Sequence, residues 1–597
     1  MPLYLRQFKH LTLGVLMLSL PAGSAAWGEP YPLRWVRFDA NFSDDARTQR
    51  GLDLVKQAGE LGLNGIVVND GKLFTLDLFR YGDMTLPRGR QYRHNLAIFV
   101  KACQEHGLEV IPQVFNPSEA KPLLGHDPNL AAGYEVRGAL FEVRDRVARL
   151  VPDPEAKLAN AGFEASEGQR FSEWSFQDRP GQATQPDRYV KRIGRQSVRL
   201  EAAAADEHGH CRVIQWVKVT PRRCYRISVW VKTDKLTPPG SFNVEVYGEG
   251  TASELRPLTY NRFDTAATQS WTQVHTVFNS LDCERVKVHI GLWGARGGRA
   301  WLDDAELTEI GLVNVLRRPG CPITVTSPDG QTLYRERYDF EPVADPRLGQ
   351  ARWPGTYDCY HEAPALRMRP DFPDGERLSV SFYHPLIIYG HQVTCCLTED
   401  RTFEMFERQF VQMVEMFRSL DTVPRRFFMT FGEHRTGGGC AACKATGKTP
   451  GRLFAEAFHR CAGIVRQHCP GAEIMAWHDM FDPAANARPE YYLMEGPMTG
   501  TWEGLDREVI VAVWDVRTRD RSLRFFAERG HRLMASADYD KATDPARFTE
   551  TWLRSMDATP GVCGILYAGW GGRYDSLATF ARIVGAHQRP TAAMGGE

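Results

Sequence analysis

The chain alternates short apolar segments with segments of helical periodicity, first near the N-terminus and again in the C-terminal half. Short apolar runs bounded by polar or Gly-rich residues are typical of buried parallel strands. Between two such runs, Phe403, Phe406, Phe410, Met413 and Phe417 recur on one face of a helix. This alternation predicts parallel βαβ units and an α/β fold, a (β/α)8 TIM-type barrel. Nine strand candidates compete for its eight places, so one is wrong or lies outside the barrel: 33–39, 64–70, 108–116, 378–384, 425–431, 472–479, 509–515, 531–540 and 563–570.

The pattern changes in the middle of the chain. Between about 158 and 310 the helical periodicity gives way to short alternating strands, such as 213–219, 225–231 and 286–293, which predict an all-β sandwich. The barrel is therefore interrupted after its third strand, at a loop where insertions are tolerated. The expected divisions are 1–26 (signal peptide), 27–157 (first part of the barrel), 158–310 (jelly-roll sandwich), 311–375 (connecting region with a β-hairpin), 376–590 (second part of the barrel) and 591–597 (tail).

The first residues have the organisation of a secretory signal. Arg6 and Lys9 precede the apolar run 11–20, and the small residues 22–26 follow it. The mature chain is expected to start near Trp27, and the protein to be exported to the periplasm or the extracellular space. The apolar run is too short to span a bilayer comfortably, so no stable membrane insertion is expected.

Composition narrows the classes of partner. With 43% hydrophobic residues the chain has ample material for large cores, and Lys plus Arg equal Asp plus Glu at 73 each, which argues against a nucleic-acid partner. Nothing in the sequence indicates the oligomeric state. The 13 cysteines are too scattered to form a disulfide framework. Cys440 and Cys443 favour a local disulfide or loop clip, with a redox site or half a zinc site as alternatives.

The leading catalytic candidate is Glu433. It follows the apolar strand 425–431, and the C-terminal ends of barrel strands are where (β/α)8 enzymes place their chemistry. A carboxyl group at this position is suited to act as a general acid. The alternative is that Glu433 pairs with Arg435 and only closes the barrel mouth.

Further polar and aromatic groups end the other strands. Asp479 is the best second carboxyl, followed by Asp39, Asp70, Asp515 and Asp538, although each also fits a purely structural hydrogen-bonding acid. Tryptophans at strand ends are suited to wall a sugar ring, and histidines there either tune an acid or sit satisfied in the core. The candidates for substrate binding are Asp39, Asp70, His434, Arg435, Trp477, His478, Trp514, Tyr539 and Trp570.

The sandwich segment resembles the family 4/9 (CenC-type) carbohydrate-binding modules. The likeness rests on the opening motif 160–164 followed by Trp174, on the strands 217–221 and 225–232, and on the closing motif 300–307. The resemblance implies a structural calcium held by Glu164 and by Asp303 or Asp304, which would suit the hard oxygen ligands this ion takes. Many such modules have become packing domains, so sugar binding by this one stays open. Five tryptophans are available for stacking: Trp174, Trp216, Trp230, Trp271 and Trp293.

Taken in order, the residues at the strand ends, Glu433, Trp477 to Asp479, Trp514, Tyr539 and Trp570, resemble those of the barrel of glycoside hydrolase family 20. In that family an adjacent Asp-Glu pair ends a strand; the Glu protonates the leaving oxygen, and the Asp orients the substrate acetamido group that acts as nucleophile. Glu433 matches the Glu, but Gly432 stands at the Asp position. The orienting carboxylate is therefore missing unless another residue supplies it.

These observations favour an exported glycoside hydrolase that acts on a polysaccharide or glycoconjugate. Glu433 would be its acid and Asp479 its partner, since glycosidases use two carboxyl groups, and no cofactor is expected for catalysis. The alternative is a non-catalytic glycan-binding protein on a degenerate barrel, which Gly432 favours. A third class, a metal-dependent hydrolase, would need zinc near Cys440 and Cys443.

Overall fold

The computed structural model describes residues 31–74, 87–114, 116–249, 255–343, 357, 360–361, 365–389, 392–540 and 542–587. The predicted signal peptide, 1–26, and the predicted tail, 591–597, lie outside these residues. No helix within the described ranges has the length and apolarity needed to cross a membrane.

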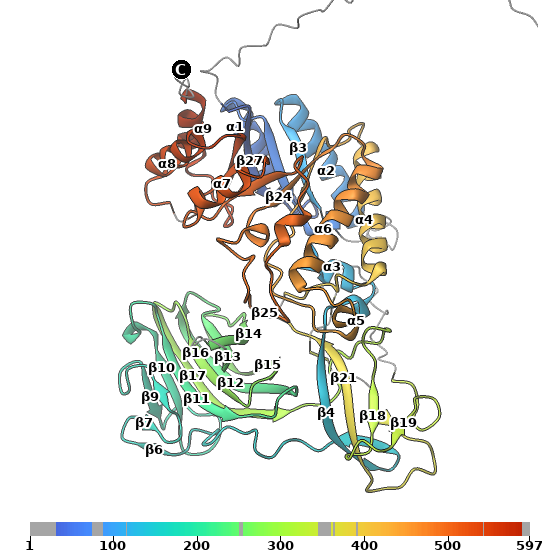
Figure 1. Cartoon of the computed structure of the whole chain (residues 1–597). Coiled ribbons are helices and arrows are strands. Elements are labelled where there is room, and N and C mark those ends of the chain that lie inside the picture. The colour runs from blue at the N-terminus through green and yellow to red at the C-terminus, as the bar shows by residue number, and fades with distance from the viewer. Residues whose placement is uncertain are drawn as a thin grey trace, which may run out of the picture.

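Eight parallel strands close into a barrel, as the sequence pattern predicts (Figure 1). Three of them precede the inserted region and five follow it, and β3 pairs with β22 across the insertion. The order around the barrel is β1 (Leu33–Asp39), β2 (Gly65–Asn69), β3 (Glu109–Val114), β22 (Arg426–Met429), β24 (Glu473–Trp477), β26 (Ile510–Val513), β27 (Arg532–Asp538) and β28 (Val562–Ala568).

The ninth strand candidate, 378–384, lies outside the barrel. It forms β21 (Arg377–Pro385), which pairs antiparallel with β4 (Gly133–Arg144) in a separate six-stranded sheet. Burial alternates along β21, with Leu378 and Val380 buried and Ser379 and Ser381 partly exposed, as expected for a strand packed on one face only. The sequence pattern suggests a barrel strand here because a helix, α4 (Asp400–Arg418), follows it, as in a strand–helix unit. The other strands of this sheet are β5 (Val147–Leu150), β18 (Thr324–Thr326), β19 (Leu333–Tyr334) and β20 (Leu366–Arg367).

Helices cover the outside of the barrel, and their starts follow from local capping. The Asp44 carboxylate accepts a hydrogen bond from the Arg47 backbone N–H, and the Thr449 hydroxyl accepts one from Arg452, with Pro450 in the first turn. The described helices are α1 (Asp45–Glu60), α2 (Pro87–Glu105), α3 (Lys121–Leu124), α4 (Asp400–Arg418), α5 (Ala441–Ala445), α6 (Pro450–His468), α7 (Arg519–Ala527), α8 (Pro545–Asp557) and α9 (Leu577–Ala586).

The inserted region contains a sandwich of two five-stranded antiparallel sheets, drawn in green below the barrel in Figure 1. One sheet has the order β15-β12-β17-β10-β9 and the other the order β14-β13-β16-β11-β8. The strands are β8 (Phe176–Gln177), β9 (Thr184–Asp187), β10 (Ser197–Glu201), β11 (Cys211–Lys218), β12 (Cys224–Thr237), β13 (Phe242–Glu249), β14 (Leu255–Arg262), β15 (Gln269–Asn279), β16 (Arg285–Leu292) and β17 (Gly297–Glu309), with a small hairpin of β6 (Ser166–Glu167) and β7 (Arg170–Phe171).

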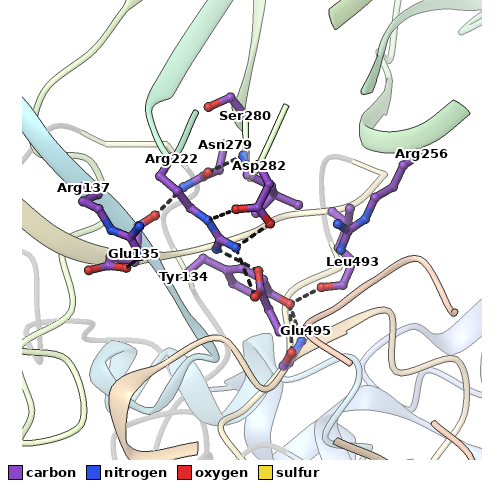
Figure 2. A network of polar contacts seen from close by, with 12 residues as sticks. Tyr134, Glu135, Arg137, Arg222, Arg256, Asn279, Ser280, Asp282, Leu493 and Glu495 are labelled. Atoms are coloured by element: carbon purple, nitrogen blue, oxygen red, sulfur yellow. Dashed lines mark hydrogen bonds and ion pairs between the residues drawn. The ribbon is translucent and has the colours of Figure 1, made fainter. Parts of the chain in front are cut away.

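A polar network docks the sandwich onto the barrel (Figure 2). The Arg222 guanidinium of the sandwich donates to Asp282 of the same domain at 2.8–2.9 Å and to Glu495 of the barrel loops at 2.9 Å. Glu495 follows β25 (Leu493–Met494), which pairs with β23 (Thr436–Gly437) just downstream of Glu433. Tyr134 connects these two short strands, since its hydroxyl donates to the Leu493 carbonyl and accepts from the Gly437 N–H. The sandwich is therefore anchored next to the segment that carries the leading catalytic candidate.

Candidate active site

The interior of the barrel is built in layers. Alternate residues of each strand point inward, and one apolar layer fills the barrel with side chains such as Trp35, Ile111, Phe428 and Met534. Two residues further along several strands, the next inward position is polar or aromatic and faces a cavity of about 730 Å³. The lining residues are Arg37, Asn69, Gly71, Gln113, Asn116, Glu119, Lys121, Pro122, Gln392, Thr430, Gly432, Glu433, Trp477, Asp479, Trp514, Asp538 and Trp570.

Glu433 lies in this cavity in an ion pair with Arg435. Its side chain is 47% exposed, whereas the Arg435 side chain is 9% exposed. Arg435 also donates to Gln392, and its guanidinium lies over the rings of Tyr389 and Tyr492, at 4.8 and 5.0 Å from their centroids. The cation is thus fixed from several sides, so it holds the Glu433 carboxyl group in position at the edge of the cavity.

Asp479 is the second carboxyl group of the cavity, and its surroundings are the opposite of those of Glu433. Burial, together with the negative charge of Glu433, raises the pKa of Asp479 from 3.8 to about 6. Two hydrogen bonds act against this rise: the Trp514 indole N–H donates to Oδ1 at 3.1 Å, and the Asn486 amide donates to Oδ2 at 2.9 Å. Asp479 therefore keeps its proton in mildly acidic solution.

Three tryptophans form an aromatic wall. The Trp477 and Trp570 rings lie 5.3 Å apart, and Trp514 meets Trp570 edge-on at 6.4 Å. Trp570 is 40% exposed, and the Arg37 guanidinium lies 4.4 Å from its ring. Arg37 is in turn held by Asp39 through two hydrogen bonds of 2.6 Å. Asp39 thus supports Arg37 from outside the cavity lining, while the exposed Trp570 ring offers a stacking surface for a sugar ring.

The other residues expected at the site lie outside the cavity lining. Asp70 is buried and accepts hydrogen bonds from the backbone N–H groups of Phe42 and Lys72. His434 and His478 are fully buried, and burial lowers their pKa values to about 3 and about 4. Tyr539 is buried and stacked on Tyr567 at 4.3 Å. Of the remaining strand-end acids, Asp538 lines the cavity, and Asp515 is held by Arg517 away from it.

Several lining residues escaped the sequence reasoning. Arg37, Asn69, Gln113 and Thr430 each lie two positions after a residue of the apolar interior layer, so strand alternation counted from that layer would have found them. The loop residues Asn116, Glu119 and Gln392, and Lys121 and Pro122 at the start of α3, have no comparable signal, because only the folded chain brings these segments to the barrel mouth.

Residues 155–294 match the sequence profile of a family described as a carbohydrate binding domain. The inserted sandwich is similar to carbohydrate-binding modules. This finding confirms the predicted likeness to families 4 and 9. The chain as a whole is a TIM-like barrel interrupted by this module. No curated protein matches the chain.

Solved structures give weaker likenesses. A structure titled "CBM4 structure and function" has 16% identity and a TM-score of 0.20, covering 26% of this chain and 99% of its own. The CBM22-1 xylan-binding domain from Paenibacillus barcinonensis has 15% identity and a TM-score of 0.21, covering 27% and 96%. A rhamnosidase from Novosphingobium sp. PP1Y has 10% identity and a TM-score of 0.30, covering 90% of this chain and 55% of its own. None of these three identifies an activity or points to glycoside hydrolase family 20, so that resemblance stays a prediction.

The acids expected to hold calcium in the module gather around one loop. Glu164 accepts from the Arg195 N–H at 2.6 Å, Asp303 accepts from the Arg192 N–H at 2.7 Å, and Asp304 pairs with the Arg192 guanidinium at 2.7 Å. Among the described residues these three carboxylates do not bring ligand atoms within 4.8 Å of one another. The Arg192 guanidinium balances the charge of Asp304. Calcium binding stays a prediction.

The module also has a surface groove of about 450 Å³ on its β8-β11-β16 face. Phe176 is 46% exposed there, and Trp216 lies in the groove beneath Arg285 and Lys287, whose charges are 5.0 and 5.7 Å from its ring. Trp174, by contrast, is buried and stacked on Phe163. Of the tryptophans considered for sugar stacking, Trp216 lines this groove and Trp174 belongs to the core.

Proposed function

We propose that this protein is an exported glycoside hydrolase that cleaves a glycosidic bond of a polysaccharide or glycoconjugate in the barrel cavity. The observation that carries the proposal is the pair of carboxyl groups with opposite surroundings in one cavity. Glu433 is half exposed and paired with a cation, while Asp479 is buried with a pKa raised to about 6. Glycoside hydrolysis needs such a pair, one group holding a proton and one carrying a charge.

The electrostatics favour a division of roles opposite to the one expected from sequence. Asp479 is the proton donor to the leaving oxygen, because burial and the charge of Glu433 keep its proton on the carboxyl up to a pH near 6. Glu433 is the charged group that stabilises the developing positive charge at the sugar carbon, or attacks it. The aromatic wall of Trp477, Trp514 and Trp570 binds the sugar ring and excludes water from one side.

The family 20 resemblance bears on the choice of sugar. Gly432 offers no carboxylate to orient an acetamido group, although a Cβ added there would meet its nearest neighbour, Trp477, at an unstrained 3.8 Å. The space for an aspartate side chain is therefore present and unused. We propose that the reaction relies on Glu433 and does not depend on assistance from an N-acetyl group.

The test is turnover of aryl glycosides and natural polysaccharides by the wild type, Glu433→Gln and Asp479→Asn, with Asp515→Asn as the matched control. Asp515 is also an acid at a barrel strand end, but it is bound to Arg517 outside the cavity. Both cavity variants should lose activity on natural substrates. Asp479→Asn should keep activity on aryl glycosides with good leaving groups, which depart without protonation, whereas Glu433→Gln should not. The reverse pattern would return the acid role to Glu433.

A non-catalytic glycan-binding protein is the second candidate. It is favoured by Gly432 and by the ion pair that occupies Glu433. Calorimetry on the same glycans distinguishes the two: binding without turnover in wild type and variants would establish the binding protein, and turnover that depends on Glu433 and Asp479 would exclude it.

A further inference from the structure

Cysteines from three separate segments meet on the barrel side of the insertion. The Cys396 sulfur lies 3.8 Å from Cys440 and 3.7 Å from Cys443, and the Cys440 and Cys443 sulfurs lie 3.4 Å apart. All three side chains are buried, and they form a group of potential metal ligands within 4.8 Å of one another. A disulfide would bring two sulfurs to about 2.05 Å, so none of these contacts is one.

A fourth cysteine adjoins this group. Cys321 is fully buried beside Cys440, and its sulfur lies farther than 4.8 Å from at least one of the other three, so it needs a small movement to complete a four-sulfur set. Gly133 fixes the packing there: a Cβ at this position would lie only 2.8 Å from the Cys321 sulfur and 3.4 Å from Cys440 Cβ. The backbone at Gly133 thus passes directly against the two cysteines, and only glycine leaves room for them.

The spacing of the sulfurs fits a tetrahedral metal centre. Zinc binds thiolates at about 2.3 Å, which places the sulfurs of a tetrahedral site about 3.8 Å apart. The sulfurs of Cys396, Cys440 and Cys443 lie 3.4–3.8 Å apart, so small shifts of their side chains would bring them to this spacing. The cavity beside Cys396, Cys440 and Cys443 measures about 10 Å³, which is room for a single water-sized species.

The surroundings suit negative thiolates. The Arg318 guanidinium lies 3.8 Å from the Cys440 sulfur and is held in place by the carbonyls of Asn129 and Ala131, at 2.7 and 2.8 Å. The Cys443 backbone N–H donates to the Cys440 sulfur at 3.5 Å. A positive side chain and an N–H donor around the sulfurs are the outer contacts that hold metal-bound thiolates in orientation.

We propose that Cys321, Cys396, Cys440 and Cys443 bind a structural zinc ion. The site is closed, because four sulfur ligands fill a tetrahedral shell and leave no position for substrate. It does not belong to the proposed chemistry, since none of the four cysteines lines the cavity of Glu433 and Asp479. The metal joins the connecting region at Cys321, the segment before α4 at Cys396, and α5, which begins shortly after the Glu433 loop.

The experiment is metal analysis of the full-length protein purified without added metal or chelator. We expect about one zinc per chain in the wild type and none above background in Cys440→Ser and Cys443→Ser. Cys103→Ser, which alters a buried cysteine of α2, is the matched control and should keep its zinc. Replacement of the ion by Co²⁺ should give the charge-transfer and d–d absorption of a tetrahedral thiolate site, a readout that does not require any variant to fold.

Three results would overturn the proposal. The first is wild-type protein without metal in which mass spectrometry finds a Cys440–Cys443 disulfide. The second is a folded Cys440→Ser variant that retains zinc. The third is a Cys321→Ser variant that holds zinc as tightly as the wild type in a competition titration with a chelator, which would remove Cys321 from the ligand set.

Discussion

Replacement of Asp479 by asparagine should stabilise the protein at neutral pH while abolishing its activity on natural substrates. Burial and the charge of Glu433 raise the pKa of Asp479 from 3.8 to about 6 in the folded protein, a difference worth about 3 kcal/mol. Because the folded-state pKa is the higher one, the native state binds this proton more tightly than the unfolded state does. The resulting stability is fully present below pH 4 and is lost as the pH rises through 6. Asparagine stays neutral throughout.

The assay is denaturant unfolding of wild type and Asp479→Asn between pH 4 and 8. The variant should gain up to about 3 kcal/mol over the wild type at pH 7.5, and the gain should shrink toward zero near pH 4. Asp515→Asn is the control of opposite sign. Burial raises the pKa of Asp515, but hydrogen bonds and the charge of Arg517 outweigh it and lower that pKa. Removing the Asp515 carboxylate should therefore destabilise the folded protein at neutral pH. An Asp479→Asn variant with a pH-independent stability difference would refute the desolvated carboxyl and the acid role derived from it.

Four further changes test other parts of the site. Arg435→Met should lower kcat/KM roughly tenfold, because Glu433 loses the cation that positions it; steady-state kinetics with KM measured separately checks this. Gly432→Asp should fold with a stability within about 1 kcal/mol of wild type, since a Cβ there meets nothing closer than 3.8 Å, and a large loss in thermal unfolding would contradict the packing. Trp570→Ala should raise KM about fivefold through the loss of about 1 kcal/mol of stacking, with little effect on folding because the ring is 40% exposed. Calcium at a hundredfold excess over its dissociation constant should raise the free energy of unfolding by about 2.7 kcal/mol, and Asp303→Asn should remove this response. A wild type that does not respond to calcium would contradict the site and leave Arg192 as the group that neutralises Asp304.

The sequence was informative where the deciding interactions are local. Strand β1 was predicted with its observed bounds, Leu33–Asp39, because its β-prone apolar residues end in an acid directly before a helix-capping segment. It was less informative for β21, whose alternation indicates one buried face but does not say which sheet it joins. Pairing partners of a strand are set by tertiary contacts that no local pattern encodes.

For the candidate site, too, the local sequence indicates some residues and only the fold determines the others. Glu433 and Asp479 could be placed at strand ends from sequence, but their electrostatic roles depend on burial and on a cation that the fold brings alongside. Arg37 was missed because a charged residue inside a strand looks like an outward one until the interior layer is known. The fourth cysteine, Cys321, lies 75 or more residues from its partners, beyond any spacing rule for metal ligands.

The pairing of β3 with β22 has a consequence for how the chain acquires its structure. Gln113 and Phe428 are neighbours in the barrel but more than three hundred residues apart in sequence, and closing a flexible loop of that length costs on the order of 5 kcal/mol. The antiparallel pair β4–β21, which joins Gly133 to Pro385, removes most of that loop once the insertion has folded. The insertion should therefore fold before the barrel closes. Until then β1, β2 and β3 present an unpaired edge, which makes the newly synthesised chain most prone to aggregation while the module is still incomplete.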